Sequence, residues 1–403
     1  MARSIVICMD GTWNKPGQTD QGVQTKTNVL KLHEALADRP DQIRKYFPGV
    51  GTDPGEKVSG GAFGWGLFDQ VKDGYRYLRE QFEPGDKIYI FGFSRGAYSA
   101  RSLAGMILRC GIVRKEYGTH DVKVPGLVAD LVSTQQDGDL KVDVADKAFA
   151  MYKHAYEKKN LPEVEQFKRE YCNDTPVRLV GVWDTVGALG IPDELFIPAL
   201  RKVDKAIDAK LFGFLDTDLS PGVEAAYHAV AIDEHRKPFL PTLWTDASGA
   251  APRVNAAGSN VEQVWFTGAH SNVGGGYADS GLSDIALKWM VDRASSNGLQ
   301  FVLAALRPDP RAKRRDSLEE FVEIAGEKKN RFFTWIDKLA TRFVSVNRPI
   351  PAGAWIHGSV GERLAAPAVS EPKSESAYRP APTLKLTTRD GVRTVDPQFR
   401  LVS

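Results

Sequence analysis

Residues 87–97 read KIYIFGFSRGA, and this stretch decides the fold. Residues 87–92 are apolar and β-rich, which is typical of a buried strand, and residues 95–109 have a helical pattern. Between them, residues 92–96 match the nucleophile elbow G-x-S-x-G, in which small neighbours permit a sharp turn that exposes the serine hydroxyl. The sequence therefore predicts a nucleophile at Ser94, and a helix N-cap is the alternative role of this serine.

Three further runs have the same apolar, β-rich character, at residues 4–9, 177–183 and 261–268. Helical patterns lie between the strands, at residues 28–36, 67–82, 147–171 and 222–232. Strands that alternate with helices predict an α/β fold, with a mostly parallel central sheet and helices on both faces. In such sheets the reacting groups gather at the carboxyl ends of the strands, and these four runs end at Asp10, Ser94, Asp184 and His270.

Asp184 and His270 complete a candidate catalytic triad with Ser94. A serine hydroxyl needs a base, and the base needs an acid that orients it. In α/β-hydrolases these residues follow the chain order Ser, Asp or Glu, His, and the order here is the same. We therefore expect His270 to be the base and Asp184 the acid, although a turn carboxylate and a buried structural histidine are the alternatives.

The loop Asp10-Gly11-Thr12-Trp13-Asn14 follows the first strand and is a candidate oxyanion hole. One backbone N–H of such a hole comes from the loop after an early strand, and the other from the residue after the nucleophile. These positions predict Gly11 or Thr12, together with Arg95, as backbone donors. Asp10 would support this loop or bind substrate.

Asp233 and His235 lie in a dense polar patch after an apolar segment. We expect them to support the site or to orient substrate, and either could replace a member of the triad. A solvated turn is the alternative.

Two other functions remain open at this stage. A metal-dependent phosphoesterase could use Asp10, Asp184, Asp233, His235 and His270, because carboxylate and imidazole groups suit such metals. No dense ligand motif accompanies these residues, however, and the serine mechanism needs no metal or organic cofactor. A catalytically silent fold used for binding is the second alternative, since folds outlive their chemistry.

Composition excludes several classes of protein. In 403 residues, 42% are hydrophobic and 26% charged, which is typical of globular domains and not of disordered or coiled-coil chains. The net charge of +2 gives no reason to expect nucleic acid as a partner. The 3 cysteines are too few for a disulfide framework. No signal peptide or membrane-spanning run is apparent, so we expect a cytoplasmic protein or one exported without a signal peptide.

We expect one domain over residues 1–403, with insertions over the sheet. Residues 113–176 carry little strand pattern and predict a helical cap, and residues 190–221 are a second candidate cap. Residues 307–403 are polar and predict an extension packed on the domain. Apolar segments at 63–68 and 195–200 are candidates for an entrance that a long-chain substrate would need, with transient contact to a membrane surface.

At its motifs the sequence resembles the α/β-hydrolase family that includes the catalytic domains of type VI secretion phospholipase effectors. The motifs are DGTWN at 10–14, GVGT at 49–52, GFSRGA at 92–97, VWDTVG at 182–187, YHAVAIDEHR at 227–236 and GAHSNVGGGY at 268–277. They follow the family order from residue 4 to about residue 290, and IHGSV at 356–360 is a fainter match.

The resemblance implies a serine esterase that acts on lipids and releases a fatty acid from a phospholipid. It assigns Ser94 as nucleophile, His270 as base and Asp184 as acid, and it is compatible with export by a specialised secretion system. The expected partner is a lipid or another ester substrate. Head group, chain length and oligomeric state are left open.

Overall fold

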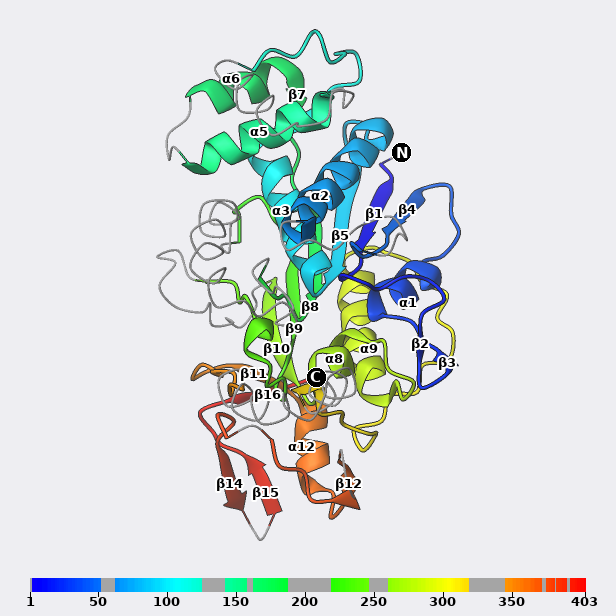
Figure 1. Cartoon of the computed structure of the whole chain (residues 1–403), viewed down its shortest axis with the longest axis vertical. Coiled ribbons are helices and arrows are strands. Elements are labelled where there is room, and N and C mark those ends of the chain that lie inside the picture. Colours follow the sequence, from blue (N-terminus) through cyan, green and yellow to red (C-terminus); the bar gives the residue numbers. More distant parts are fainter. Residues whose placement is uncertain are drawn as a thin grey trace, which may run out of the picture.

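The structure is a computed structural model. It describes residues 2–51, 62–124, 142–157, 162–187, 219–245, 260–318, 345–371, 375–380, 382–389 and 392–403. Figure 1 shows these residues as an elongated molecule, with α5 (Val144–Glu157) and α6 (Pro162–Tyr171) at one end. The opposite end carries α12 (Gly358–Ala365) and the hairpin of β14 (Leu386–Arg389) and β15 (Val392–Val395).

In the described part of the chain, eight strands form one central sheet, and every neighbouring pair in it is parallel. Across the sheet the strands are β16 (Arg400–Val402), β11 (Trp355–His357), β10 (Val261–Phe266), β9 (Ala226–Ala231), β8 (Leu179–Trp183), β5 (Lys87–Phe93), β1 (Ser4–Met9) and β4 (Gln42–Phe47). The predicted α/β class is confirmed. Because all strands run the same way, their carboxyl ends meet along one edge, where Ser94, Asp184 and His270 follow their strands.

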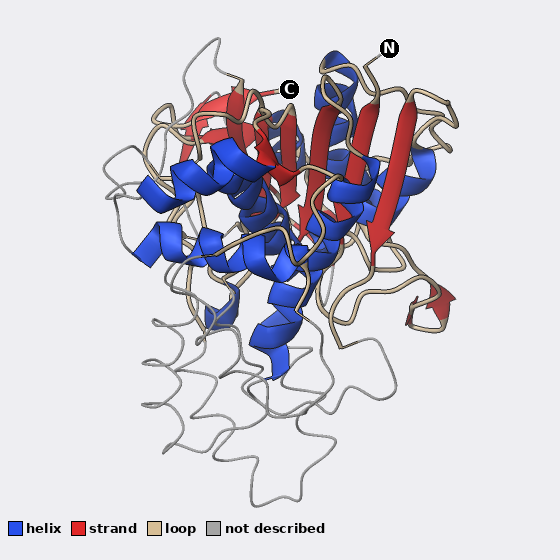
Figure 2. Cartoon of the chain, turned by 90° about the horizontal axis from the view of Figure 1, so that it is seen from above, coloured by secondary structure: helices blue, strands red, loops and turns tan. Residues whose placement is uncertain are grey.

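Helices cover both faces of this sheet, as Figure 2 shows. On one face lie α2 (Ala62–Gln81) and α3 (Arg95–Cys110), and on the other lie α1 (Asn28–Ala35) and α9 (Gly281–Ser296). Side chains of a strand alternate between the two faces. In β1, accordingly, Ile5 packs in the core with α2 and α3, whereas Val6 packs in the core with α1 and α9. Burial on both faces explains why these strands are continuously apolar.

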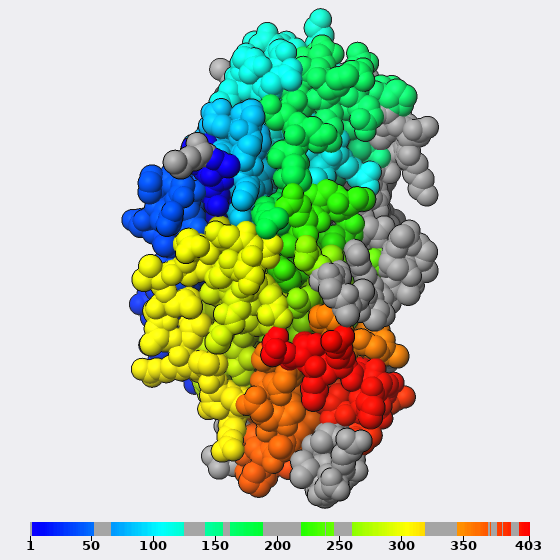
Figure 3. Space-filling view, turned by 180° about the vertical axis from the view of Figure 1, so that it is seen from behind, coloured from blue at the N-terminus to red at the C-terminus, as the bar shows by residue number. Residues whose placement is uncertain are grey.

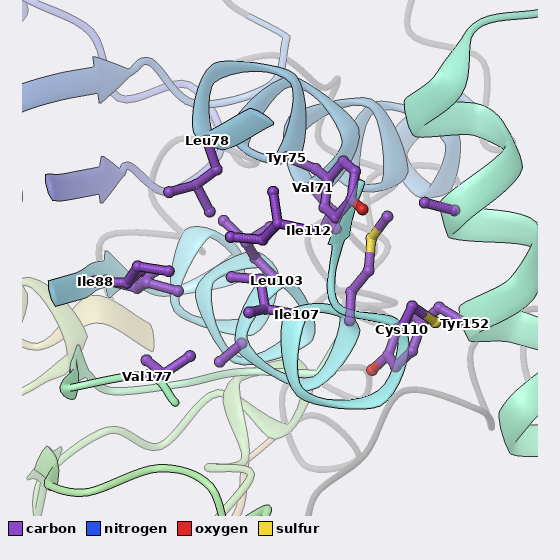
Figure 4. Packing of buried hydrophobic residues seen from close by; sticks show 14 of the residues in the cluster. Val71, Tyr75, Leu78, Ile88, Leu103, Ile107, Cys110, Ile112, Tyr152 and Val177 are labelled. Carbon is purple, nitrogen blue, oxygen red and sulfur yellow. The ribbon is translucent and has the colours of Figure 1, made fainter. Parts of the chain in front are cut away.

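Buried side chains of the helices pack against one another in the core beside the sheet. Figure 4 shows Leu78 of α2 and Leu103 of α3 pointing toward one another, with Tyr152 of α5 on the far side of α3. Tyr75 is fully buried and its hydroxyl accepts a hydrogen bond of 3.0 Å from the N–H of Val113. The pair β6 (Ile112–Val113) and β7 (Cys172–Asn173) thus fixes the chain as it leaves α3, at the end of this helix that is remote from Ser94.

The predicted cap over residues 113–176 contains α5 and α6 in its described part. Phe149 of α5 packs on Phe68 of α2, with ring centroids 5.2 Å apart. Asp143 and Asp146, at the start of α5, pair with Arg76 and Lys72 of α2. The helices form a third layer against α2 and α3. The second candidate cap, residues 190–221, lies outside the described residues except for 219–221.

The C-terminal part contributes to the sheet itself. We expected an extension packed on the domain, and β11 and β16 are two of the eight strands of the central sheet. A third core cluster joins α12 to β9 and β10, with Val360 packed alongside Val230 and Trp265. In Figure 3 the orange and red atoms of this part lie against yellow atoms, which belong to α9 and the chain that follows it. Two further short strand pairs lie outside the central sheet: β2 (Thr19–Asp20) with β3 (Val23–Gln24), and β12 (Val369–Ser370) with β13 (Glu375–Ser376).

Two secondary-structure expectations were wrong. Residues 222–232, predicted as a helix, contain β9, which lies between β8 and β10 with all six of its residues buried. Its alanines favour a helix in isolation, but small side chains also suit a strand that is covered on both faces. The helix predicted over 147–171 is two helices, because Pro162 has no N–H for a helix interior and begins α6 instead.

Close backbone contact between α3 and β1 generates a prediction for Gly96. A Cβ at Gly96 would lie 2.4 Å from the carbonyl oxygens of both Met9 and Asp10. We expect Gly96→Ala to lower the free energy of unfolding by about 1–3 kcal/mol through overpacking. Gly361→Ala is the control, since its Cβ would meet nothing nearer than Leu401 at 3.6 Å.

The control should gain up to about 1 kcal/mol from helix propensity. Urea unfolding followed by circular dichroism measures both effects. Equal stability of the two variants would contradict the tight approach of α3 to β1.

Candidate active site

Ser94 lies between β5 and α3 in a backbone conformation that few residues other than glycine adopt. Its φ is 58°, in the left-handed region. Its N–H donates to the carbonyl of Trp183 at 3.1 Å, which anchors the turn to the neighbouring strand β8. The hydroxyl makes no capping bond to α3, so the alternative role of Ser94 as a helix N-cap is not observed. Strain of this kind is typical of a functional turn.

Ser94, His270 and Asp184 form one hydrogen-bonded line. His270 Nε2 lies 2.7 Å from Ser94 Oγ, and His270 Nδ1 lies 2.5 Å from Asp184 Oδ2. An ionised carboxylate only accepts hydrogen bonds, so Nδ1 is the donor and Nε2 is left to accept from the serine hydroxyl. The structure therefore brings together the three residues that the sequence predicted as a set.

His270 begins the short helix α8 (His270–Gly274) and sits between two aromatic rings. Its ring lies 4.5 Å from that of Phe93 and 4.9 Å from that of Phe239, measured between centroids. Burial lowers the pKa of His270 below its ordinary value, although the hydrogen bond and charge of Asp184 oppose this shift. The imidazole is accordingly neutral near pH 7, as a general base must be.

Asp184 is completely buried at the end of β8. Its Oδ1 accepts from the N–H of Ala231 at 2.9 Å and from Nη1 of Arg348 at 2.6 Å. Nη2 of Arg348 donates to Oδ2 at 2.9 Å. Burial by itself would raise the pKa of Asp184, but the charge of Arg348 and the hydrogen bond from His270 hold it well below its ordinary value. The carboxylate is therefore ionised.

Arg348 is a site residue that the sequence did not predict. It has no exposed surface, and its guanidinium also donates to the carbonyls of Ala231, at 2.8 Å, and Phe239. It is 164 residues from Asp184 in the chain and follows no strand or helix in the described part of the C-terminal region. The only available signal was an arginine within an otherwise uncharged stretch, residues 343–361, apart from His357.

Asp233 holds the loop that leads to His270. Its Oδ2 accepts from the N–H of Gly268 at 2.8 Å and from the hydroxyl of Tyr378 at 2.8 Å. His235 is tied through its carbonyl to the N–H of Val346, 2.8 Å away. Because Asp184 occupies the position next to the imidazole Nδ1, the geometry gives neither Asp233 nor His235 the role of a triad member.

Glu234 supports His270 from the other side. Its Oε2 accepts from the backbone N–H of His270 at 3.2 Å and from the hydroxyl of Ser317 at 2.8 Å. Burial would raise the pKa of Glu234, but the adjacent guanidinium of Arg236 lowers it to about 2. The buried carboxylate of Glu234 therefore stays ionised, and it fixes the start of α8.

A second buried histidine, His228 of β9, positions the residue after Asp184. Its Nε2 accepts from the N–H of Thr185 at 3.1 Å, and its Nδ1 lies 3.4 Å from Oε1 of Gln263. Burial lowers its pKa to about 3, so it is neutral. In the sequence, His228 appears only within the motif at 227–236, without a strand end to mark it.

Asp10 organises the loop that the sequence predicted as an oxyanion hole. Its Oδ1 accepts from the N–H of Gly11 at 2.8 Å. Its Oδ2 accepts from the hydroxyls of Thr27, at 2.5 Å, and Tyr46, at 2.8 Å. Burial raises the pKa of Asp10 to about 6, and these three hydrogen bonds limit the rise. The N–H of Gly11 is thereby used within the loop.

The same loop closely approaches the elbow. A Cβ on Gly11 would lie 2.8 Å from Cβ of Ser94, so only glycine fits there. Trp13 has a positive φ of 64° and is 46% exposed, and the guanidinium of Arg95 lies 5.5 Å from its ring. Thr12 lies between Gly11 and Trp13 in this loop.

The five residues of the alternative metal site do not form one cluster. Asp184 contacts His270 and Arg348, but Asp10 bonds to Gly11 in its own loop and Asp233 bonds to Gly268. Within the described ranges no group of three or more His, Cys, Asp and Glu side chains is placed to hold a metal ion.

The candidate entrance is described only in part. Leu67 and Phe68 are buried in the core with α2 and α3, so this end of the segment is not an entrance. The side chains of 63–65 and residues 195–200 lie outside the described residues. None of the helices in the described ranges combines the length and apolar character that a bilayer crossing requires.

A strained serine on a strand–helix turn, at the carboxyl edge of a parallel sheet, defines the α/β-hydrolase class. The family model of the catalytic domain of Tle1-like phospholipase effectors of type VI secretion systems matches residues 3–293. The chain belongs to this family.

The sequence identity to individual proteins is low. An uncharacterized protein of Saccharomyces cerevisiae is 28% identical over 266 residues, which covers 60% of this chain and 33% of that protein. The chain thus spans a third of the length of this relative. A crystal structure of an uncharacterized protein from Pseudomonas aeruginosa has a TM-score of 0.39 and 18% identity, and covers 76% of this chain and 47% of that one. The structure of the Tle1 effector bound to the VgrG spike has a TM-score of 0.42 and 13% identity, over 85% of this chain and 80% of that one.

The contacts of Asp10 generate a prediction for Thr27. Its hydroxyl donates to Asp10 and also accepts from the N–H of Leu30 at 3.2 Å, which caps α1. Thr27→Ala should lower the free energy of unfolding by roughly 2–4 kcal/mol, because a cap and a bond to a buried carboxylate are both lost. Thr27→Ser retains the hydroxyl and should cost about 1 kcal/mol or less.

Urea unfolding of the two variants measures the difference. If the serine variant were as unstable as the alanine variant, the methyl group rather than the hydroxyl would carry the interaction.

Proposed function

We propose that this protein is a serine hydrolase that cleaves carboxylic esters of lipids, as a phospholipase A or related esterase. The hydrogen-bonded line from Ser94 through His270 to Asp184, at the elbow of an α/β-hydrolase sheet, is the observation that carries the proposal. Membership of a phospholipase effector family supports a lipid as the substrate class.

In the proposed mechanism Ser94 Oγ attacks the ester carbonyl while its proton passes to Nε2 of His270. Asp184 keeps the imidazole oriented and stabilises the imidazolium that forms. Collapse of the tetrahedral intermediate breaks the ester bond, and His270 gives the proton to the leaving alcohol. A water molecule then attacks the acyl-enzyme, His270 again takes a proton, and the fatty acid and free Ser94 are released. No cofactor enters these steps.

The oxyanion would be stabilised by two backbone N–H groups, those of Thr12 and Arg95. Gly11, the other candidate in the loop, donates to Asp10, which favours Thr12. Arg95 is the first residue of α3, so its N–H belongs to the helix N-terminus, where the helix dipole favours negative charge. Preorganised donors of this kind contribute about 3–4 kcal/mol each to the barrier reduction.

The family also supports delivery by a type VI secretion system, with phospholipid as substrate and transient contact with a membrane surface. Under this proposal the enzyme acts on a phospholipid ester drawn from the bilayer.

A covalent probe tests the nucleophile. We expect a fluorophosphonate to label the full-length protein at Ser94, and Ser94→Ala to abolish both labelling and the release of fatty acid from phospholipid vesicles. Ser99→Ala is the control, because Ser99 is also buried on α3 but one turn away from the elbow. Labelling that persists in Ser94→Ala would refute the assignment. Release of the head group, with or without its phosphate, in place of fatty acid would favour a phosphoesterase.

The lowered pKa of His270 predicts the pH profile. The base acts only when neutral, and burial shifts its pKa below the ordinary value of about 6.5. Protonation therefore begins only at lower pH, and the acid-side midpoint of the labelling rate should lie below about pH 6.5. A midpoint above pH 7 would show that Asp184 outweighs burial and that His270 is charged near neutrality.

A further inference from the structure

We propose that Arg348 is a positioning residue of the active site, which holds both oxygens of Asp184 and thereby sets the pH range in which His270 is a base. This inference rests on the proposed function and extends it to a residue beyond the matched family region, which ends at residue 293. Arg348 touches no reacting atom and acts through Asp184.

The geometry of the pair is bidentate. Nη1 and Nη2 of Arg348 lie 2.6 and 2.9 Å from the two oxygens of Asp184, and both side chains have 0% exposure. Two parallel bonds from a planar guanidinium fix the plane of the carboxylate, which a single donor would leave free to rotate. Oδ2 is consequently directed at His270 Nδ1, at 2.5 Å.

The charge of Arg348 has a second effect. Asp184 attracts a proton to His270, and a cation on the same carboxylate weakens that attraction. His270 therefore remains neutral at lower pH than it would beside an isolated buried aspartate. The charge of Arg348 thus makes His270 a weaker base, and it widens the range of pH in which the imidazole is neutral and can accept the serine proton.

Other charges around the pair act on His270 in both directions. Arg236 lowers the pKa of His270 and Glu234 raises it, and these two form an ion pair with each other at 2.9 Å. His228, on the neighbouring strand β9, is neutral because burial lowers its pKa to about 3. Among the residues that the structure describes, Arg348 is the cation that pairs directly with Asp184.

Further contacts from the same C-terminal region reach the loop that carries His270. The hydroxyl of Tyr378 donates to Asp233, and that of Ser317 donates to Glu234, each at 2.8 Å. The region beyond residue 293 therefore completes the support of the base as well as of the acid.

The chain offers a matched control for a buried arginine. Arg363 also has no exposed surface, donates to a carboxylate, that of Glu371 at 2.9 Å, and binds two backbone carbonyls. Its carboxylate partner bonds to Arg314 instead of a histidine. Loss of either arginine removes similar interactions, but only Arg348 is connected to His270.

The test is the pH dependence of fluorophosphonate labelling in full-length Arg348→Met, Arg348→Lys and Arg363→Met, together with the folded fraction of each. In Arg348→Met we expect the acid-side midpoint to move up by about one pH unit. Its plateau rate should fall roughly 10- to 100-fold through misorientation of the triad.

Arg348→Lys retains the charge but not the fork, so its midpoint should stay near that of the wild type while its plateau rate falls. Arg363→Met should be less stable with an unchanged midpoint. A folded Arg348→Met with the wild-type midpoint, or an equal shift in Arg363→Met, would overturn the inference. If Arg348→Met does not fold, Arg348→Lys provides the test. A wild-type plateau rate in Arg348→Lys would also overturn the inference.

Failure of the proposed function gives a different result. If wild-type protein were not labelled at Ser94, the serine hydrolase assignment would fall. If it were labelled and the Arg348 variants kept its profile, only the role of Arg348 would be lost.

Discussion

The site depends on one buried charge, the carboxylate of Asp184, which has no contact with solvent. Removing a carboxylate from water costs several kcal/mol unless its oxygens are fully bonded. Here a strand N–H, a guanidinium and an imidazole occupy them. Each partner comes from a different part of the chain, so the site exists only when the sheet, the His270 loop and the C-terminal region are assembled together.

Other buried carboxylates around the site also hold separate segments of the chain together by hydrogen bonds. Asp10 binds the loop beside Ser94 to Thr27, Asp233 binds Gly268, and Glu234 binds the start of α8. Each carboxylate has few alternative arrangements once it is buried, because an unpaired oxygen there is costly. These bonds keep the site rigid even though its residues lie in loops.

The sheet sets where these groups meet. Ser94 and Asp184 both follow strands with a positive φ, at 58° and 40°. Two adjacent parallel strands place these turns side by side, and β10 delivers His270 from beyond β9. The last two strands of this sheet, β11 and β16, come from the C-terminal region, so the part of the chain outside the matched family region belongs to the same sheet and core.

The sequence by itself determined the α/β class, the elbow at Ser94 and the order of Ser, Asp and His, because continuous apolar runs and strand-end polar residues are local patterns. The prediction of a helix over residues 222–232 was wrong, because the alanines of β9 favour a helix in isolation but also suit a strand that is buried on both faces of the sheet. Tertiary structure alone decided that Arg348 reaches Asp184 across 164 residues, and that Gly11 gives its N–H to Asp10. Partners of a buried charge are chosen by distance in space, and no periodicity in the chain encodes that distance.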